Sequence, residues 1–194
     1  MTDIIKQEAQ ILNAEEYNLM RDALNYRHRL VFDGLLFTGM RGTEFWIFIE
    51  HPEWFHPERQ YINLTKEAIK KERTRFKERN VLLSHVGTRA IRDLVDAIKR
   101  GEVEHISRMG WGEDLKRAAR KAGLKTQAGI TPKMTRKTWV SWLMAVFSYD
   151  GLRISSSLGH DVRTMQEHYL SLPFSTYEIE QIKPLVTGWG NNRA

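Results

Sequence analysis

One strongly apolar segment, HRLVFDGLLFTG at residues 28–39, constrains the fold of this chain more than any other feature. Its spacing of apolar residues predicts a helix, and Gly39 is placed to end that helix. The positions we expect to be buried are Leu30, Val31, Leu35 and Leu36. The chain has 194 residues, which is enough to cover such a helix within one core. We therefore expect residues 1–194 to form a single domain.

The rest of the chain is predicted to be mainly helical. The run NAEE at residues 13–16 is typical of a capping box that opens a helix. Two short strands, at residues 61–64 and 80–83, flank a basic connection and predict a hairpin. Further helices are expected over residues 42–49, 87–100, 113–122, 135–147, 152–158, 161–170 and 175–187. The fold class is therefore mainly α with a small antiparallel β-sheet or hairpin, an α+β arrangement.

The positive charge of the chain is concentrated in two blocks. The sequence has 30 basic and 24 acidic residues, a net charge of +6. Residues 66–79 carry a net charge of +4 and residues 113–137 one of +6, whereas residues 1–60 carry −4. Two separated basic blocks indicate one basic face, which is typical of a protein that binds nucleic acid. The alternative is ordinary solvated surface, and charge alone does not decide between the two.

Two absences in the sequence narrow the chemistry and the location. There is no cysteine, which excludes disulfides, thiolate zinc sites and cysteine nucleophiles. No apolar stretch approaches the ~18 residues that a membrane span needs, and the first residues do not form a signal peptide. We therefore expect a soluble, cytoplasmic protein without membrane contact.

Two short motifs place cationic side chains at the starts of helices. In TGMRGTE, Arg41 follows the glycine that ends the apolar helix, and Glu44 can fix its guanidinium. In PKMTRK, Lys133 and Arg136 lie one turn apart at a helix N-terminus, which favours an anion. Taken alone, each motif is more typical of a helix-start salt bridge or a solvated basic helix.

A histidine and a tyrosine complete the candidate residues. His160 follows the helix stop LG and begins the next predicted helix, and Tyr169 lies nine residues further on. Taken alone, such a histidine is usually a packed or capping residue, and such a tyrosine a half-buried anchor. Their order and spacing give them weight, because 24 residues separate Arg136 from His160 and 9 separate His160 from Tyr169.

The candidate residues together form one ordered pattern, Arg41, Lys133-x-x-Arg136, Leu158-Gly159-His160 and Tyr169. This pattern resembles the catalytic signature of the tyrosine recombinases, the phage-type integrase family, over nearly the whole chain. The resemblance implies the catalytic-domain fold of that family. Lys133 stands where the family usually has histidine, which is similar to the archaeal and archaeal-virus integrases. Full members also carry an N-terminal domain that clamps DNA, and we expect this chain to lack it.

The resemblance implies cleavage of a DNA strand without a metal or other cofactor. Arg41, Arg136 and His160 would bind the oxygens of the scissile phosphate. Lys133 would add charge or assist the deprotonation of the tyrosine. Tyr169 would be the nucleophile and would form a 3′-phosphotyrosyl link, which a second DNA end can resolve.

The resemblance also gives the basic blocks roles on DNA. A hairpin lysine would protonate the leaving 5′ oxygen, and we expect Lys71, with Lys77 in reserve. The C-terminal tail, residues 175–194, is expected to contact a neighbouring protomer in a tetramer on DNA, with a monomer when free. The side chains expected to follow DNA phosphates are Arg73, Arg75, Lys77, Arg79, Arg117, Arg120 and Lys121.

The function implied is site-specific recombination or integration of double-stranded DNA, in the virus or mobile-element manner. Two alternatives stay open at this point. The first is a DNA-binding regulatory or architectural protein without catalysis, and the second is a relative that nicks and closes DNA without strand exchange. Tyr169 separates the first alternative from the enzyme, because a protein that only binds has no need of a tyrosine in register with His160 and Arg136.

Overall fold

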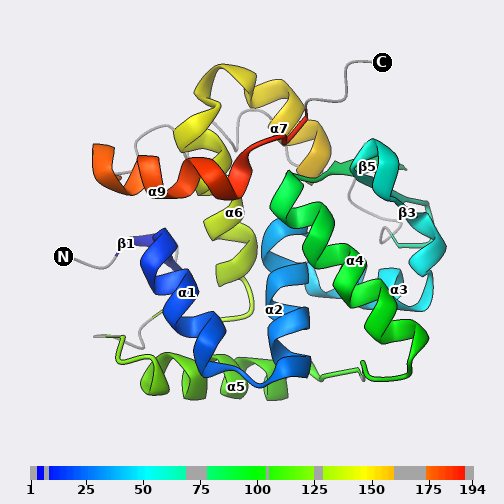
Figure 1. The fold of residues 1–194 in the computed structure, drawn as a ribbon, viewed down its shortest axis with the longest axis horizontal. Coiled ribbons are helices and arrows are strands. Elements are labelled where there is room, and N and C mark those ends of the chain that lie inside the picture. Colours follow the sequence, from blue (N-terminus) through cyan, green and yellow to red (C-terminus); the bar gives the residue numbers. More distant parts are fainter. Residues whose placement is uncertain are drawn as a thin grey trace.

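The computed structural model places a central helix among the other helices and two small sheets (Figure 1). The helices are α1 (Ala14–Ala23), α2 (Tyr26–Thr38), α3 (Gly42–Glu50), α4 (His85–Lys99), α5 (Arg108–Lys121), α6 (Met134–Val146), α7 (Gly151–Leu158) and α9 (Thr176–Val186). Single 3₁₀ turns, η1 (Pro52–Trp54), η2 (Pro57–Arg59) and η3 (Ser148–Asp150), join some of them. The residues that the structure describes are 4–6, 9–68, 78–103, 105–124, 129–159 and 174–190.

Helix α2 is the core of the molecule, as the apolar segment predicts. Every residue from Leu30 to Thr38 is buried. Figure 1 shows α2 between α1 and α4, with α5 across its lower end and α7 and α9 at its upper end. Because a helix that is buried all round needs neighbours on every side, α2 fixes where the other helices lie. Gly34 allows one close approach, since a Cβ there would lie 2.8 Å from the Phe45 ring on α3.

Helix α1 begins as its sequence predicts. The Asn13 side chain accepts a hydrogen bond from the backbone N–H of Glu16 at 2.9 Å, and the Glu16 carboxylate accepts one from the backbone N–H of Asn13 at 2.9 Å. This capping box satisfies two N–H groups that the helix itself leaves free. Helices α4 and α5 begin earlier than expected, because Ser84 and Ser107 cap them and bond to Gly87 and Gly110.

The larger sheet has three antiparallel strands in the order β3 (Phe55–His56), β4 (Tyr61–Leu64) and β5 (Arg79–Leu82). Ile62 pairs with Val81, and Leu64 pairs with Arg79. The predicted hairpin is thus confirmed, with its second strand one residue earlier than the predicted 80–83 and with β3 added. A second sheet pairs β1 (Ile4–Lys6) with β2 (Ala9–Ile11), which the sequence pattern did not indicate. The mainly helical class with a small antiparallel sheet is confirmed.

The C-terminal segment packs on its own chain. Ile182, Val186 and Trp189 are buried. The Trp189 indole N–H donates to the carbonyl oxygen of Leu82 at 3.0 Å, which joins this segment to β5. The apolar side chains of the segment are therefore used within the chain, and its contact with a second protomer stays a prediction. None of the described helices is long and apolar enough to cross a membrane.

A buried polar cluster joins α1 to α2. The Tyr17 hydroxyl donates to Asp33 Oδ1 at 2.9 Å, and Arg21 Nε donates to Asp33 Oδ2 at 2.8 Å. Burial and the Asp33 carboxylate raise the pKa of Tyr17 above its usual value, so its hydroxyl stays a donor. Burial also raises the pKa of Asp33, against the opposing effects of Arg21 and Tyr17.

We expect Tyr17→Phe to lower the free energy of unfolding by about 1–3 kcal/mol, because the variant keeps the buried ring and leaves Asp33 short of one donor. Urea denaturation followed by circular dichroism measures this difference. Tyr149→Phe is the matched control, since Tyr149 is 86% exposed. Equal stabilities for the two variants would contradict a stabilising role of the Tyr17 hydroxyl.

Candidate functional site

Three arginines from separate parts of the chain lie close to the carboxylate of Glu44. Arg41, just before α3, donates through Nη1 to Glu44 Oε1 at 2.8 Å. Arg79, on β5, donates through Nη2 to Oε2 at 2.7 Å. Arg136, on the first turn of α6, brings Nη1 to 4.0 Å from the same oxygen. We call Glu44 with Arg41, Arg79 and Arg136 the arginine cluster.

Glu44 is held in place by the start of α3 itself. It is the third residue of that helix, and its Oε2 also accepts from the backbone N–H of Arg41 at 2.8 Å. This is the glutamate half of a capping box, which satisfies a free N–H group at a helix start. The pairing of Arg41 with Glu44 that the TGMRGTE motif predicts is therefore present.

Two helix ends converge on Arg136. Its Nη1 donates to the carbonyl oxygen of Gly39 at 2.6 Å, and its Nη2 donates to that of Leu158 at 2.7 Å. These carbonyls lie at the C-terminal ends of α2 and α7, where the negative ends of the helix dipoles favour a cation. Both helices end on a left-handed glycine, Gly39 with φ 59° and Gly159 with φ 64°.

Gly39 is needed for a second reason. A Cβ at this position would lie 2.6 Å from Leu158 Cδ2 and 2.7 Å from Trp139 Cδ1. The end of α2 therefore packs directly on the end of α7 and on α6, which keeps the two carbonyl groups within reach of one guanidinium.

Arg79 lies inside the molecule, which corrects one prediction. The basic block predicts that it follows DNA phosphates on the surface, yet only 4% of its side chain is exposed. Its Nε donates to the carbonyl oxygen of Ser157 at 3.1 Å. The alternation along β5 carries a signal for this, because position 79 faces the same side as the buried Val81.

The three guanidinium groups differ in their access to solvent. The exposed share of the side chain is 43% for Arg41, 12% for Arg136 and 4% for Arg79. Arg41 is thus the member that a large ligand can reach most directly. Lys133, one turn before Arg136, is exposed at the start of α6. The two residues of the PKMTRK motif therefore lie at the same helix end, as predicted.

The charges of the arginine cluster do not cancel. Burial alone would raise the pKa of Glu44, but the charges of Arg79 and Arg136 and the hydrogen bonds that Glu44 accepts outweigh it and lower that pKa. Glu44 is therefore ionised at neutral pH, and three guanidinium cations surround one carboxylate. Such a surplus of fixed positive charge suits a phosphate, whose oxygens match the guanidinium fork.

Other predicted residues lie elsewhere or outside the described residues. Arg117, Arg120 and Lys121 are exposed on α5, which crosses the opposite end of α2 from the arginine cluster (Figure 1). Arg117 pairs with Asp114 at 3.0 Å. The predicted residues outside the described ranges are Lys71, Arg73, Arg75, Lys77, His160 and Tyr169. Among the described residues, no group of three or more histidine, aspartate or glutamate side chains could hold a metal ion.

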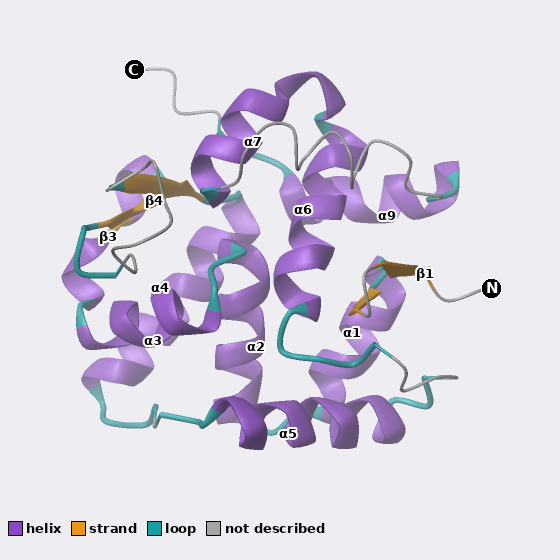
Figure 2. Cartoon of the chain, turned by 180° about the vertical axis from the view of Figure 1, so that it is seen from behind, coloured by secondary structure: helices purple, strands orange, loops and turns teal. Residues whose placement is uncertain are grey.

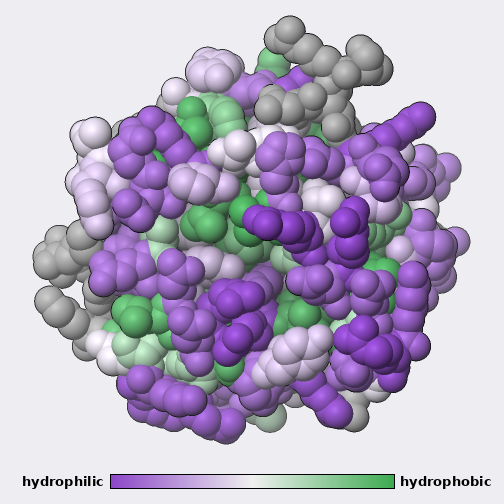
Figure 3. All heavy atoms as spheres, viewed as in Figure 1, coloured by the Kyte–Doolittle hydropathy of each residue, from purple (hydrophilic) through white to green (hydrophobic). Residues whose placement is uncertain are grey.

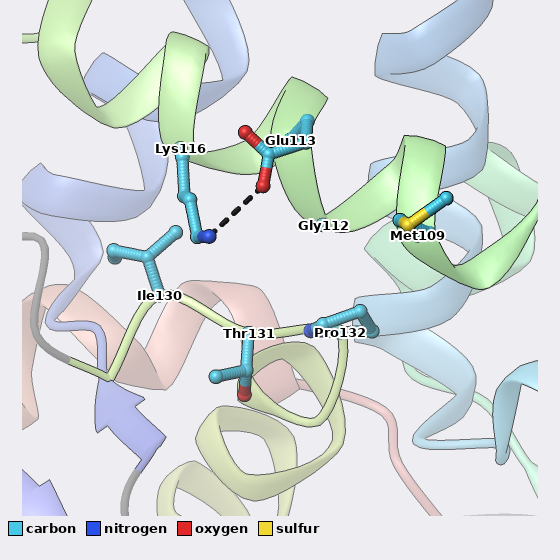
Figure 4. Close-up of a pocket in the computed structure, with 7 residues that line it drawn as sticks. All are labelled: Met109, Gly112, Glu113, Lys116, Ile130, Thr131 and Pro132. Carbon is cyan, nitrogen blue, oxygen red and sulfur yellow. Dashed lines mark hydrogen bonds and ion pairs between the residues drawn. The ribbon is translucent and has the colours of Figure 1, made fainter.

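A surface depression of about 430 Å³ lies between α5 and the loop that leads into α6 (Figure 4). Figure 2, from behind, shows this loop close to α5. The charged residues of its lining, Glu113 and Lys116, pair with each other at 2.9 Å. The depression brings no surplus charge together, so the arginine cluster is the better candidate for chemistry on a phosphate.

The described elements have the arrangement of the tyrosine recombinase fold. The crystal structure of XerA recombinase is similar to this chain with a TM-score of 0.59 at 16% sequence identity, over 95% of this chain and 65% of that one. This chain thus spans just under two thirds of the length of that protein, and the likeness shows the fold. No model of a known protein family and no curated protein matches the sequence.

The ionisation of Glu44 predicts a pH-dependent stability. In the folded state the pKa of Glu44 lies below the unfolded value of ~4.3. The contribution of the Glu44 carboxylate to the free energy of unfolding is therefore complete above that value and is lost as the pH falls through the folded pKa. We expect Glu44→Gln to lower the free energy of unfolding by about 3–5 kcal/mol at pH 7, because it leaves a buried arginine unpaired.

Urea denaturation of the two proteins between pH 7 and pH 3 checks this, and the difference should shrink in acid as the wild-type carboxyl gains its proton. Glu113→Gln removes the partner of an exposed lysine and serves as the control, with little change at any pH. A difference that stays constant down to pH 3 would mean that the charge of Glu44 contributes nothing.

Proposed function

We propose that this chain is the catalytic domain of a tyrosine recombinase, which cuts and rejoins double-stranded DNA through a 3′-phosphotyrosyl intermediate. One observation carries the proposal. Arg41 and Arg136 belong to the same sequence pattern but lie far apart in the sequence, and both lie beside the buried carboxylate of Glu44. The likeness of the fold to XerA recombinase supports it.

In this proposal, the arginines hold the scissile phosphate and stabilise its transition state. Arg41 and Arg136 bind the non-bridging oxygens and neutralise the charge that develops as the phosphorus becomes five-coordinate. Arg136 keeps one orientation, because both of its terminal nitrogens donate to fixed backbone carbonyls. His160, which directly follows the glycine that ends α7, is the third donor.

The covalent step exchanges one phosphate ester for another. The hydroxyl oxygen of Tyr169 attacks the phosphorus, and its proton passes to water, while the positive charge of Lys133 assists this deprotonation. The bond from phosphorus to the 5′ oxygen breaks, and a lysine of the hairpin, Lys71 with Lys77 in reserve, protonates that oxygen. The phosphotyrosyl ester keeps the energy of the broken bond, so a second DNA 5′-hydroxyl can reverse the step without ATP.

The proposed partner is double-stranded DNA, and the proposed assembly is a tetramer on DNA formed from free monomers. Figure 3 shows one face on which hydrophobic residues appear only as small, separate patches among hydrophilic ones. The proposed setting is the cytoplasm, at the nucleoid when bound, with integration or excision of a mobile element of the archaeal or viral kind as the task.

The nucleophile is tested with nicked duplexes of randomised sequence, labelled at the 5′ end of the cut strand. After cleavage, the short product strand diffuses away and the labelled strand stays on the protein, so we expect a labelled protein band on a denaturing gel. Tyr169→Phe should abolish this band, because the new side chain has no hydroxyl, whereas Tyr149→Phe should keep it.

A band that persists in Tyr169→Phe would show that another residue is the nucleophile. No band with any duplex, together with tight DNA binding, would favour the DNA-binding protein without catalysis.

The role of α5 predicts a salt-dependent affinity for DNA. Replacing both Arg117 and Arg120 by alanine should weaken DNA binding by a similar factor on every sequence, and should lower the slope of log affinity against log salt by about 0.9 for each phosphate that the variant no longer neutralises. Fluorescence anisotropy at several salt concentrations measures both. The matched control replaces the exposed Arg89 and Arg92 of α4, and an equally weakened affinity in that control would refute a specific role for α5.

A further inference from the structure

We propose that Arg79 is a positioning residue. It neutralises Glu44 and fixes the end of α7, so that Arg41 and Arg136 stay oriented toward a phosphate and their positive charge stays available to it. The inference rests on the proposed function and extends it to a residue outside the recombinase pattern of the sequence. Arg79 itself does not touch the phosphate in this proposal, because only 4% of its side chain is exposed.

Arg79 connects three elements through one planar group. Its Nη2 bonds to Glu44 at the start of α3 at 2.7 Å, and its Nε bonds to the Ser157 carbonyl at the end of α7 at 3.1 Å. A second bond ties the same strand to α7, since the Leu82 N–H donates to Ser157 Oγ at 2.9 Å. β5 is thereby locked onto the helix whose last carbonyl orients Arg136.

The site is shaped for an arginine. A Cβ at Gly159 would lie 3.2 Å from Arg79 Cζ and 3.2 Å from Nη1, so the guanidinium packs closely on the backbone just before His160. A lysine has a single terminal nitrogen, and it cannot reach Glu44 and the Ser157 carbonyl in the same fixed directions. The guanidinium of Arg79 therefore fits at this point because residue 159 is a glycine, which has no side chain to crowd it.

The charge balance shows what Arg79 adds. Without it, the Glu44 carboxylate would be neutralised by Arg41 and Arg136 alone, and it would draw both guanidinium groups inward. With Arg79 bonded to Oε2, the carboxylate is paired from the interior side, and the surplus positive charge stays on the members nearer the solvent. A phosphate in front of Arg41 is then attracted by a larger net charge.

A purely structural reason for this ion pair is the weaker explanation. Burying two charges costs several kcal/mol each, and apolar side chains of similar size often stabilise a protein as well or better. In an electrostatically prepared anion site, by contrast, the position of each cation affects the rate, so a buried ion pair that fixes those positions has a use.

Three variants test the inference in the nicked-duplex assay, at a temperature where urea curves show every protein folded. We expect Arg79→Met to slow the covalent step by about 10- to 100-fold, as for other residues that orient ligand-binding groups. Arg79→Lys keeps the charge and should regain part of the rate. Added to Glu44→Gln, Arg79→Met should slow the reaction by a smaller factor than Arg79→Met alone, because the charge pair with Glu44 is already lost and only the bond to the Ser157 carbonyl remains to be removed.

The control is Arg153→Met. Arg153 also donates to a backbone carbonyl, that of Gly190 at 2.9 Å, and packs on that glycine. Its other partner is Asp150, so these bonds lie outside the arginine cluster. Its replacement should leave the rate unchanged. A folded Arg79→Met variant that reacts at the wild-type rate would overturn the inference. The inference would also fail if the rates of all variants fell only in proportion to their loss of stability.

A measurement without catalysis separates this inference from the proposed function. In NMR spectra of the ¹⁵N-labelled protein, inorganic phosphate should shift the Nε–Hε signal of Arg41, and Arg79→Met should raise the phosphate concentration needed about tenfold. If no duplex gives a covalent product and this dependence remains, the recombinase proposal fails and the role of Arg79 stands. If phosphate binding is equal in both proteins, the role of Arg79 fails.

Discussion

The arrangement of the arginine cluster depends on the buried carboxylate of Glu44. A charge in the interior must be paired, and here the partners come from the start of α3, from β5 and from α6. Satisfying one carboxylate therefore brings together three elements that are far apart in the sequence. The same contact keeps the cations from repelling one another, so a dense positive site can exist in a folded protein.

The central helix α2 supplies the second constraint. It is buried from Leu30 to Thr38, and its end at Gly39 is fixed by packing on Trp139 and Leu158. That packing presents the Gly39 carbonyl beside the carbonyl of Leu158, and Arg136 bonds to both. The apolar core thus orients a polar group at its edge, because the helix ends that close the core are also the acceptors that hold the guanidinium.

The sequence predicts those features that depend on neighbouring residues. The apolar segment 28–39, the cap at Asn13, the glycine ends of α2 and α7 and the pairing of Arg41 with Glu44 are all local, and the structure has them. The burial of Arg79 is not local, since it follows from strand register and from the approach of α7. Helix α5 is longer than its pattern predicts for a related reason: Gly110 and Gly112 resemble loop, while the Ser107 cap and the buried Trp111 hold them in the helix.

The burial of Arg79 also changes what the net charge means. The net charge of residues 66–79 counts every cation as if it were exposed and available to a polyanion. At least one of them, Arg79, is instead paired in the interior. Exposed cations such as Arg117 give affinity that salt weakens, and any nucleic-acid-binding protein can have them. A buried carboxylate that fixes three arginines costs desolvation, and salt-dependent affinity of that kind does not require it. That cost is offset in a site where the position of positive charge decides a rate, and on this ground we propose an enzyme rather than a protein that only binds DNA.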